Sequence, residues 1–262
     1  MQLRIATWNV NSIRSRLEHL LHYLQNEVPE ILLLQETKCE NSQFPAESLE
    51  DLGYNLAFHG QKSYNGVAIL SRLPLEDIVT ALPNESGEQA RYIEAVVSLP
   101  QNQSLRVASV YVPNGQEVGS EKFTYKLSFL NNLFQHAKEL LTEQSLLVMG
   151  GDYNVSPYAM DVYDAAKLDG TVCYHHSERE RLRAIMNLGL YDAFRSLHPT
   201  TQEFSWWDYR ANSFERNHGL RIDHLLLSAK ALDVTQHCVM QKSERARDKP
   251  SDHIPVMCTL NF

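Results

Sequence analysis

Residues 146–154 read Leu146-Leu147-Val148-Met149-Gly150-Gly151-Asp152-Tyr153-Asn154, an apolar run that passes directly into a carboxylate and an amide. The run is short and rich in Leu and Val, as strands buried between layers are. Comparable runs recur along the chain, and we predict strands over Leu3–Val10, Ile31–Gln35, Val67–Leu70, Tyr92–Leu99, Leu105–Val112, Leu146–Gly150, Ile222–Leu227 and Val256–Leu260.

Amphipathic helices are predicted between these strands. Apolar residues spaced three and four apart line one helix face, and capping signals mark helix ends. The signals are, in chain order, the capping-box pair Ser15 and Glu18, the apolar stripe from Phe123 to Leu141, and the pair Ser177 and Glu180 with Gly189 to end the helix. We therefore expect two β-sheets packed face to face with helices outside.

The composition is that of a folded globular protein. Hydrophobic residues make up 43% and charged residues 21% of the 262 residues, far from a disordered composition. No linker, repeat or low-complexity tract divides the chain, so we expect one domain over residues 1–262. The sequence contains neither a signal-peptide pattern nor an apolar run of roughly 18 residues that would span a membrane. The four cysteines show no C-x-x-C pairing, and we expect a cytoplasmic protein without membrane contact.

The formal net charge of -8 argues against a protein that coats nucleic acid through bulk positive charge. A protein with this charge that binds an anionic polymer must gather its basic side chains on one face. Clusters that would supply such a face, or that are simply solvated surface, are Arg14 with Arg16, Lys122 with Lys126, Arg210 with Arg216 and Arg221, and Arg245 with Arg247 and Lys249.

Polar side chains follow several of the predicted strands at the point where each strand ends. They are Asn9 and Asn11, Glu36, Tyr111, Asp152 with Asn154, and Asp223. Any one of them has a simpler explanation as a turn residue, a surface acid or a core aromatic. Together they predict an acidic cluster at one rim of the sheets, which needs a cation. Oxygen ligands without paired cysteines favour magnesium or manganese over zinc.

Seven short blocks, in order from the first strand to the last, resemble the signature blocks of the exonuclease III and abasic-site endonuclease family. The blocks are Trp8–Asn11, Leu34–Lys38, Asn65–Leu70, Tyr111–Asn114, Gly151–Asn154, Gly219–Asp223 and Pro250–His253. The resemblance implies an α+β, four-layer α/β/β/α sandwich with two mixed sheets and an active site at one end. It also implies a Mg²⁺-dependent nuclease acting on double-stranded DNA, with Mn²⁺ as a possible substitute, and we expect a monomer.

The resemblance also implies roles for individual residues. Glu36 is expected to bind the metal with help from Asn9, and Asp152 to orient and deprotonate the attacking water. Asn154 would hold that water, and Tyr111 would contact the phosphate. Further expectations concern the last blocks: Asp223 orients His253, which binds the phosphate, and Asp252 lies on the metal side. His224 is an alternative partner of Asp223.

The segment Phe204–Arg210 resembles the family's aromatic tract beside a pocket for a flipped-out abasic sugar. Trp206, Leu220 and Ile222 are expected to form the wall of this pocket. Asn114 and Arg221 are further candidates for substrate binding. Trp207 and Tyr209 are expected in the core.

Two features depart from the family pattern. Asn11 stands where some members have aspartate, which puts a second metal ion in doubt. The tract Tyr158–His176 is acidic, with Asp161, Asp164 and Asp169, and Asp169 is expected to repel the DNA backbone. The balance between exonuclease and abasic-site endonuclease activity therefore stays open. A lipid phosphodiesterase of the same superfamily and a catalytically silent DNA-binding relative are the alternative functions.

Overall fold

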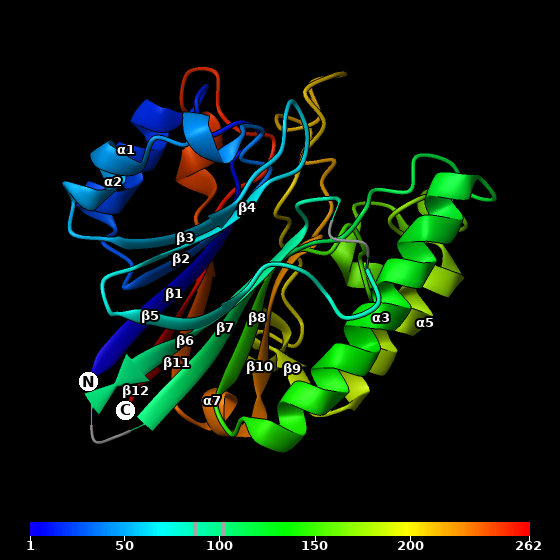
Figure 1. Ribbon diagram of the computed structural model, residues 1–262. Coiled ribbons are helices and arrows are strands. Elements are labelled where there is room, and N and C mark those ends of the chain that lie inside the picture. The colour runs from blue at the N-terminus through cyan, green and yellow to red at the C-terminus, as the bar shows by residue number, and fades with distance from the viewer. Residues whose placement is uncertain (86–87, 101–102) are drawn as a thin grey trace.

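Two six-stranded β-sheets lie face to face with helices on both outer sides in the computed structural model, which describes residues 1–85, 88–100 and 103–262 (Figure 1). The first sheet has the order β11-β12-β1-β2-β4-β3, and the second β5-β6-β7-β8-β10-β9. Each contains one parallel pair, β1 with β2 and β7 with β8, among antiparallel neighbours. The predicted α+β sandwich of two mixed sheets is confirmed.

The first sheet is built from both ends of the chain. Its strands are β1 (Gln2–Asn9), β2 (Ile31–Gln35), β3 (Asn55–His59), β4 (Val67–Ser71), β11 (Thr235–Met240) and β12 (Val256–Asn261). The second sheet comes from the middle of the chain. Its strands are β5 (Leu75–Val79), β6 (Tyr92–Leu99), β7 (Gln103–Tyr111), β8 (Leu147–Asp152), β9 (Leu190–Asp192) and β10 (Asp223–Ser228).

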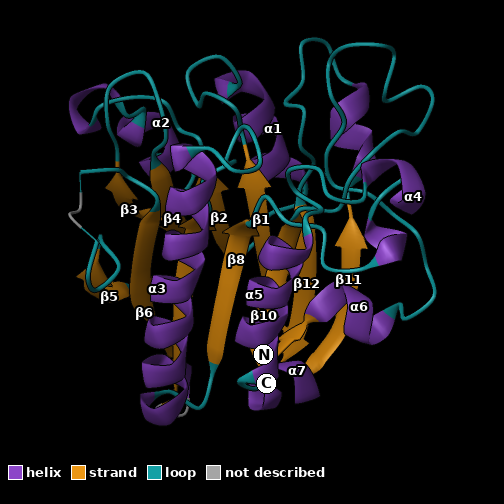
Figure 2. Cartoon of the chain, turned by 90° about the vertical axis from the view of Figure 1, so that its right-hand side faces the viewer, coloured by secondary structure: helices purple, strands orange, loops and turns teal. Residues whose placement is uncertain are grey.

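Helices form the outer layers. The helices α1 (Leu17–Asn26) and α2 (Ala46–Glu50) cover the first sheet, and α3 (Glu121–Glu143) and α5 (His176–Asn187) cover the second (Figures 1 and 2). The short helices are α4 (Ala165–Leu168), α6 (Ala193–Leu197) and α7 (Ala229–Asp233). No helix among the described residues is long and apolar enough to cross a membrane.

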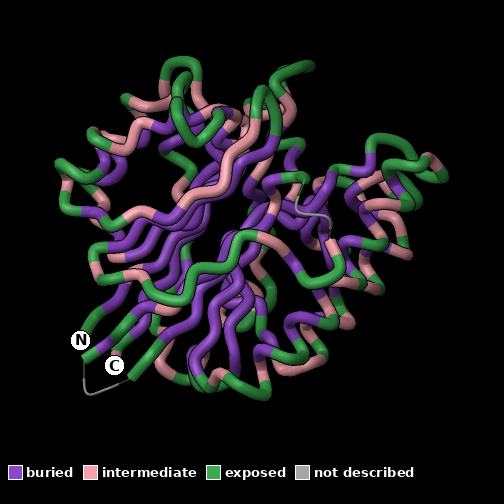
Figure 3. Tube along the Cα trace, in the orientation of Figure 1, coloured by how far each residue is buried: buried purple, intermediate pink, exposed green. Residues whose placement is uncertain are grey.

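Three apolar layers hold the sandwich together. Alternate residues of β1 show how they form, because Leu3 and Ile5 face the second sheet whereas Ala6 and Trp8 face α1. The buried trace in Figure 3 accordingly runs through the strands of both sheets. A polar layer lies between the sheets near the ends of β1 and β2, where Gln35 Nε2 donates to Thr7 Oγ1 at 3.0 Å and to Ser109 Oγ at 2.9 Å.

All eight predicted strands are present, with ends shifted by up to two residues. Four further strands, β3, β5, β9 and β11, were not predicted. Two predicted helix caps are wrong, because α1 begins after Arg16 without a side-chain cap, and α5 begins after His175. In α5, Glu178 accepts from the His175 N–H at 3.2 Å. Gly189, at φ 112°, follows the end of α5 as expected.

Candidate active site

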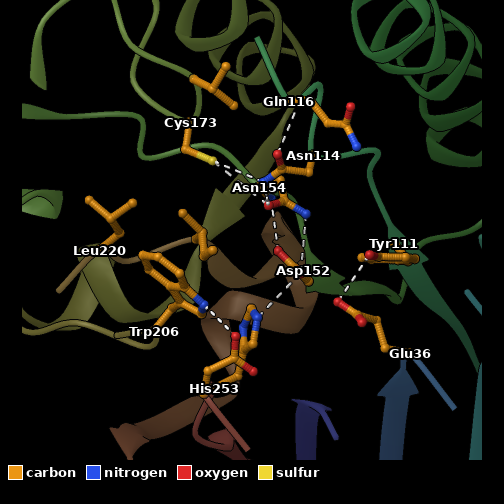
Figure 4. Close-up of a pocket in the computed structure, with 13 residues that line it drawn as sticks. Glu36, Tyr111, Asn114, Gln116, Asp152, Asn154, Cys173, Trp206, Leu220 and His253 are labelled. Atoms are coloured by element: carbon orange, nitrogen blue, oxygen red, sulfur yellow. Dashed lines mark hydrogen bonds and ion pairs between the residues drawn. The ribbon is translucent and has the colours of Figure 1, made fainter. Parts of the chain in front are cut away.

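Strand register brings the predicted site residues to one end of the sandwich. Tyr111 pairs with Asp152 across β7 and β8, and Asp152 pairs with Asp223 across β8 and β10. In the facing sheet, Asn9 pairs with Gln35, so that Glu36 follows immediately beside Asn9. Side chains from both sheets therefore meet at this rim (Figure 4).

Asn9 joins the two carboxylates of the site. Its buried amide nitrogen donates to Glu36 Oε1 at 2.8 Å and to Asp152 Oδ2 at 2.9 Å. The Tyr111 hydroxyl donates to the same Glu36 oxygen at 3.0 Å. Asn154 supports Asp152 from its other side, because its backbone N–H donates to Oδ1 at 2.9 Å and its amide to Oδ2 at 3.2 Å. The carboxylates are thus held in place by hydrogen bonds from neighbouring side chains and backbone.

His253 lies between two aspartates. Its Nδ1 contacts Asp223 Oδ2 at 2.9 Å, and its Nε2 lies 3.7 Å from Asp152 Oδ2. His224, the alternative partner of Asp223, instead contacts the Val155 carbonyl through Nε2 at 2.8 Å. The predicted pairing of Asp223 with His253 is therefore the one in the structure.

Burial and neighbouring charges shift the ionisation of these groups. Burial raises the pKa of Asp152 to about 7, against the attraction of His253 and with a further contribution from Asp223. Burial lowers the pKa of His253, but Asp223 and Asp152 outweigh it and raise that pKa to about 10. The site therefore combines a carboxylate suited to accept a proton near neutral pH with an imidazolium beside it.

Glu36 belongs to the group of side chains that could hold a metal ion. Glu36, Asp152 and His253 each bring a potential ligand atom, and these atoms lie within 4.8 Å of one another. The two carboxylates are the donors available while His253 is protonated. Burial favours the neutral form of Glu36, but Lys38 and Asn9 hold its pKa below the usual value, so the carboxylate is charged. Lys38 Nζ lies 2.6 Å from Glu36 Oε2, a contact that sequence reasoning missed. The oxygen donors are those that hard divalent cations prefer.

Asp252, predicted both to act in catalysis and to bind metal, lies at the edge of this cluster. Its Oδ2 accepts from Trp206 Nε1 at 2.9 Å and its Oδ1 from Asn11 Nδ2 at 2.9 Å. Both oxygens are therefore occupied by neutral donors in the structure. Asn11 Oδ1 also accepts from Lys38 Nζ at 2.5 Å. A lysine ammonium therefore lies beside Asn11, the position where the lack of an aspartate already weakens the case for a second metal ion.

A cavity of about 340 Å³ opens beside the carboxylates. Trp206, Leu220 and Ile222 line one side of it, as predicted, and the isolated bridges from Trp206 to Leu220 and His253 fix this wall to the site. Asn114 lines the opposite side, where its amide donates to Asn154 Oδ1 at 3.0 Å. Sequence reasoning missed three further lining residues, which lack any motif of their own: Gln116, Val172 and Cys173.

Several predicted surface positions are buried. Arg221 was a substrate-binding candidate, but it is fully buried, with Nε 2.8 Å from Asp161 and Nη1 2.7 Å from Asp192. This prediction is wrong, because the guanidinium points into the core beneath the pocket wall. Lys126 and Arg245 are also buried, so neither can belong to an exposed basic cluster. Of the two aromatic residues expected in the core, Trp207 is buried there, whereas Tyr209 is 50% exposed, so the prediction for Tyr209 is wrong.

The acidic tract is partly neutralised by its own neighbours. Asp161 is buried between Arg195 and Arg221, and Asp164 accepts from the backbone of Lys167 at the start of α4. Asp169 is exposed but lies 3.2 Å from Arg179. The expected repulsion of DNA by Asp169 is therefore weakened by this ion pair.

Several residues at the site have a backbone conformation in the left-handed region. Its φ values are 44° at Asn11, 53° at Glu36, 52° at Lys38 and 51° at Asn154. Asparagine tolerates this region, whereas glutamate and lysine adopt it rarely. The Ser12 N–H donates to the Glu36 carbonyl at 2.8 Å and helps to hold this turn.

The fold and the site together place the protein in a class of phosphoester-cleaving enzymes. The chain belongs to the Endonuclease/Exonuclease/phosphatase family, which matches residues 6–253. Exodeoxyribonuclease III of Haemophilus influenzae is 31% identical, over 97% of this chain and 98% of that protein. A 3′ phosphatase from Neisseria, solved with a product DNA hairpin, has a TM-score of 0.95 and 36% identity, over 99% of this chain and 100% of that one. An AP endonuclease from Archaeoglobus fulgidus has a TM-score of 0.94 and 36% identity, with the same coverage.

Proposed function

We propose that this protein hydrolyses phosphodiester bonds in double-stranded DNA with Mg²⁺ bound at Glu36. It is a DNA repair nuclease of the exonuclease III type. The observation that carries the proposal is the single hydrogen-bonded unit of Glu36, Asn9 and Asp152, which faces His253 at the mouth of a cavity with an apolar wall.

Each side chain at this rim has a proposed role in the reaction. Asp152 accepts a proton from the attacking water, and Asn154 holds that water beside the carboxylate. The His253 imidazolium, held by Asp223, places positive charge where negative charge grows on the phosphate oxygens. Tyr111, whose hydroxyl donates to Glu36 in the structure, would contact the phosphate. Glu36, with Asp252 nearby, would hold Mg²⁺, and the bound ion would supply positive charge to polarise the phosphate and stabilise the leaving oxygen.

DNA is the substrate that the relatives support, and the exposed basic side chains agree with it. Lys62, Arg210 and Lys249 are exposed. They belong to the connections between β3 and β4, between α6 and β10, and between β11 and β12, which reach the site end of the sandwich (Figure 1). Because the protein carries a net negative charge, a face with such basic loops is where it can contact the phosphate backbone. We propose that it works there as a monomer, that residues 1–262 form one catalytic domain, and that it acts in the cytoplasm.

The cavity supports cleavage at abasic sites alongside action at 3′ ends. A nucleotide without its base leaves the helix at the lowest cost, and an apolar wall accepts its bare sugar. Trp206, Leu220 and Ile222 form such a wall next to the catalytic carboxylates. We propose that both activities share Asp152 and His253.

Three duplexes test the proposal: one with an internal abasic site, one with a recessed 3′ end and one with a 3′ phosphate. Cleavage is measured with Mg²⁺, with Mn²⁺ and after chelation, and Asp152→Asn is the control for contaminating nucleases. We expect metal-dependent activity on all three substrates. No activity on any duplex, together with hydrolysis of a phosphoinositide or sphingomyelin, would show that the protein is a lipid phosphodiesterase.

A further inference from the structure

A lysine lies fully buried directly beneath the candidate active site. Lys126, on the first turns of α3, has no exposed surface. Its Nζ donates to the carbonyl of Asn114 at 3.0 Å, to the carbonyl of Asn154 at 2.8 Å and to Glu178 Oε1 at 2.7 Å. An ammonium group has three N–H donors, and here all three are used.

The surrounding elements are arranged to admit this side chain. Ser120 caps α3 by accepting from the Phe123 N–H at 3.1 Å, which fixes the helix start below the loop that carries Asn114. Gly115 has φ 92°, and a Cβ there would lie 3.1 Å from Lys126 Cδ. The positive φ favours glycine at this position, and a Cβ there would crowd the lysine stem that passes under the loop.

Glu178 provides the counter-charge from a different helix. Its second oxygen accepts from the His175 N–H at 3.2 Å at the start of α5. The ion pair is 0% exposed on both sides. Burying two charges costs several kcal/mol, and replacing such a pair with apolar side chains is often neutral for stability. Stability alone is therefore a poor explanation for this pair.

The two carbonyls bound by Lys126 belong to residues whose side chains line the cavity. The Asn114 amide donates to Asn154 Oδ1, and the Asn154 amide donates to Asp152 Oδ2. One ammonium therefore ties together the backbone of both asparagines, which are 40 residues apart in the chain and come from separate loops.

We propose that Lys126 is a positioning residue, which sets the separation of Asn114 and Asn154 and thereby the orientation of the amides around Asp152. The inference rests on the proposed function, since it concerns the same reaction. Lys126 itself touches neither water nor substrate. It acts through the two backbone carbonyls.

The test removes both charges together, because Lys126→Met alone would leave Glu178 buried and unpaired. In Lys126→Met/Glu178→Gln we expect kcat on the abasic-site duplex to fall by about 10- to 100-fold, the cost of a misplacement of roughly 1 Å. The Mg²⁺ concentration for half-maximal activity should stay unchanged, because Glu36 is not contacted. Wild-type kcat in a folded variant would overturn the proposal.

A matched control removes another buried ion pair that has no contact with the site. Arg106 Nη1 lies 3.0 Å from Glu94 Oε1 in the second sheet, with both side chains largely buried. Arg106→Met/Glu94→Gln should lose stability and keep kcat within about twofold. An equal loss of kcat in both pair variants would mean that general destabilisation, and not positioning, explains the effect.

Two further measurements separate positioning from other causes. In an Asn114→Ala/Asn154→Ala background, the Lys126 pair substitution should lower kcat by no more than about twofold further, since the side-chain amides that Lys126 positions through the backbone are gone. A full additional loss would overturn the proposal. If Lys126→Met/Glu178→Gln does not fold, Lys126→Arg serves instead, because a planar guanidinium cannot direct donors to the same three acceptors.

NMR of the side-chain amides keeps the proposal testable without turnover. The Asn114 and Asn154 NH₂ signals should shift or broaden in the pair variant and stay unchanged in the Arg106 control. If the wild-type protein cleaves none of the three duplexes, the proposed function fails, while these signals still decide whether Lys126 positions the asparagines. Unchanged signals would overturn the positioning role.

Discussion

The Asp223 carboxylate holds the His253 ring from behind, with its two oxygens 2.9 Å and 3.1 Å from Nδ1. The opposite ring nitrogen then faces Asp152. A carboxylate behind an imidazole fixes the ring orientation and stabilises its charged form. Because Asp223 is the first residue of β10 and pairs in register with Asp152, the strand sets this geometry.

Asp223→Asn should lower turnover by about 10²-fold or more, because His253 loses the group that orients and charges it. The neighbouring His224 provides the matched control, since it contacts Val155 and Arg221 and not the site. His224→Gln should keep kcat within a few-fold. Steady-state kinetics on the abasic-site duplex measures both, and a larger loss in His224→Gln would contradict the assignment.

Asp152→Asn should leave the fold intact and reduce turnover by about 10²–10⁴-fold, the contribution of a positioned base. The amide retains the hydrogen bond from the Asn154 N–H to Oδ1 but cannot accept a proton from water. Single-turnover cleavage and thermal unfolding measure the two effects. Near-normal turnover would remove Asp152 from the mechanism.

Glu36→Gln should weaken metal binding, with activity partly recovered at high Mg²⁺, because an amide oxygen is a poorer ligand than a carboxylate. The comparison is a Mg²⁺ titration of activity in wild type and variant. Glu47→Gln on α2, away from the site, is a control that should match wild type. An unchanged half-saturation point in Glu36→Gln would show that Glu36 does not bind the metal.

Trp206→Ala should reduce cleavage at abasic sites more than removal of a 3′ phosphate. The indole forms part of the apolar wall, whereas the phosphate chemistry belongs to Asp152 and His253. The ratio of the two activities is the measurement. Trp207→Phe, which changes a buried neighbour, should leave this ratio unaltered. Equal losses of both activities in Trp206→Ala would contradict the placement of the sugar pocket.

Asp192 links stability to pH through Arg221. Burial favours the neutral acid, but Arg221 and His224 hold the pKa of Asp192 well below its usual value. A carboxylate with a lowered pKa stabilises the fold fully above its unfolded pKa of about 3.9, and the contribution is lost as the pH falls toward the folded pKa.

Asp192→Asn should therefore cost about 3–5 kcal/mol at neutral pH, the usual cost of breaking a buried pair. The difference from wild type should shrink below about pH 4. Urea unfolding across this range measures it. Asp169→Asn, which breaks the exposed pair with Arg179, should change the free energy of unfolding by less than about 1 kcal/mol. A difference for Asp192→Asn that is independent of pH would contradict the linkage.

The rim of polar residues was predictable because strand and side chain are adjacent in the sequence. Asn9, Glu36 and Asp152 each follow an apolar run, so the run predicts both the strand and the place where its end residue lies. The pairing of Asp223 with His253 spans thirty residues. The family resemblance implied this pairing, whereas the local sequence pattern alone did not distinguish His253 from His224 as the partner of Asp223.

Buried ion pairs were not predictable from the sequence. Lys126 and Arg221 resemble surface residues, and their partners Glu178 and Asp161 lie 52 and 60 residues away. The stripe predicted for α3 shares Phe123, Leu130 and Ala137 with the buried face of that helix, but the buried face also includes the polar Lys126 and His136, which an apolar pattern does not mark. The edge strand β5 was missed because most of its residues are exposed and do not form an apolar run.

The left-handed backbone at Glu36 and Lys38 limits how this site can be moved to another scaffold. A graft that copies only the side chains onto idealised strands would aim the carboxylate along a different direction. Each such non-glycine residue costs about 1–3 kcal/mol, which the recipient must supply from its own stability. A successful transplant would therefore carry the turn from Gln35 to Lys38 together with the segment around Ser12 that hydrogen-bonds to it, as one unit.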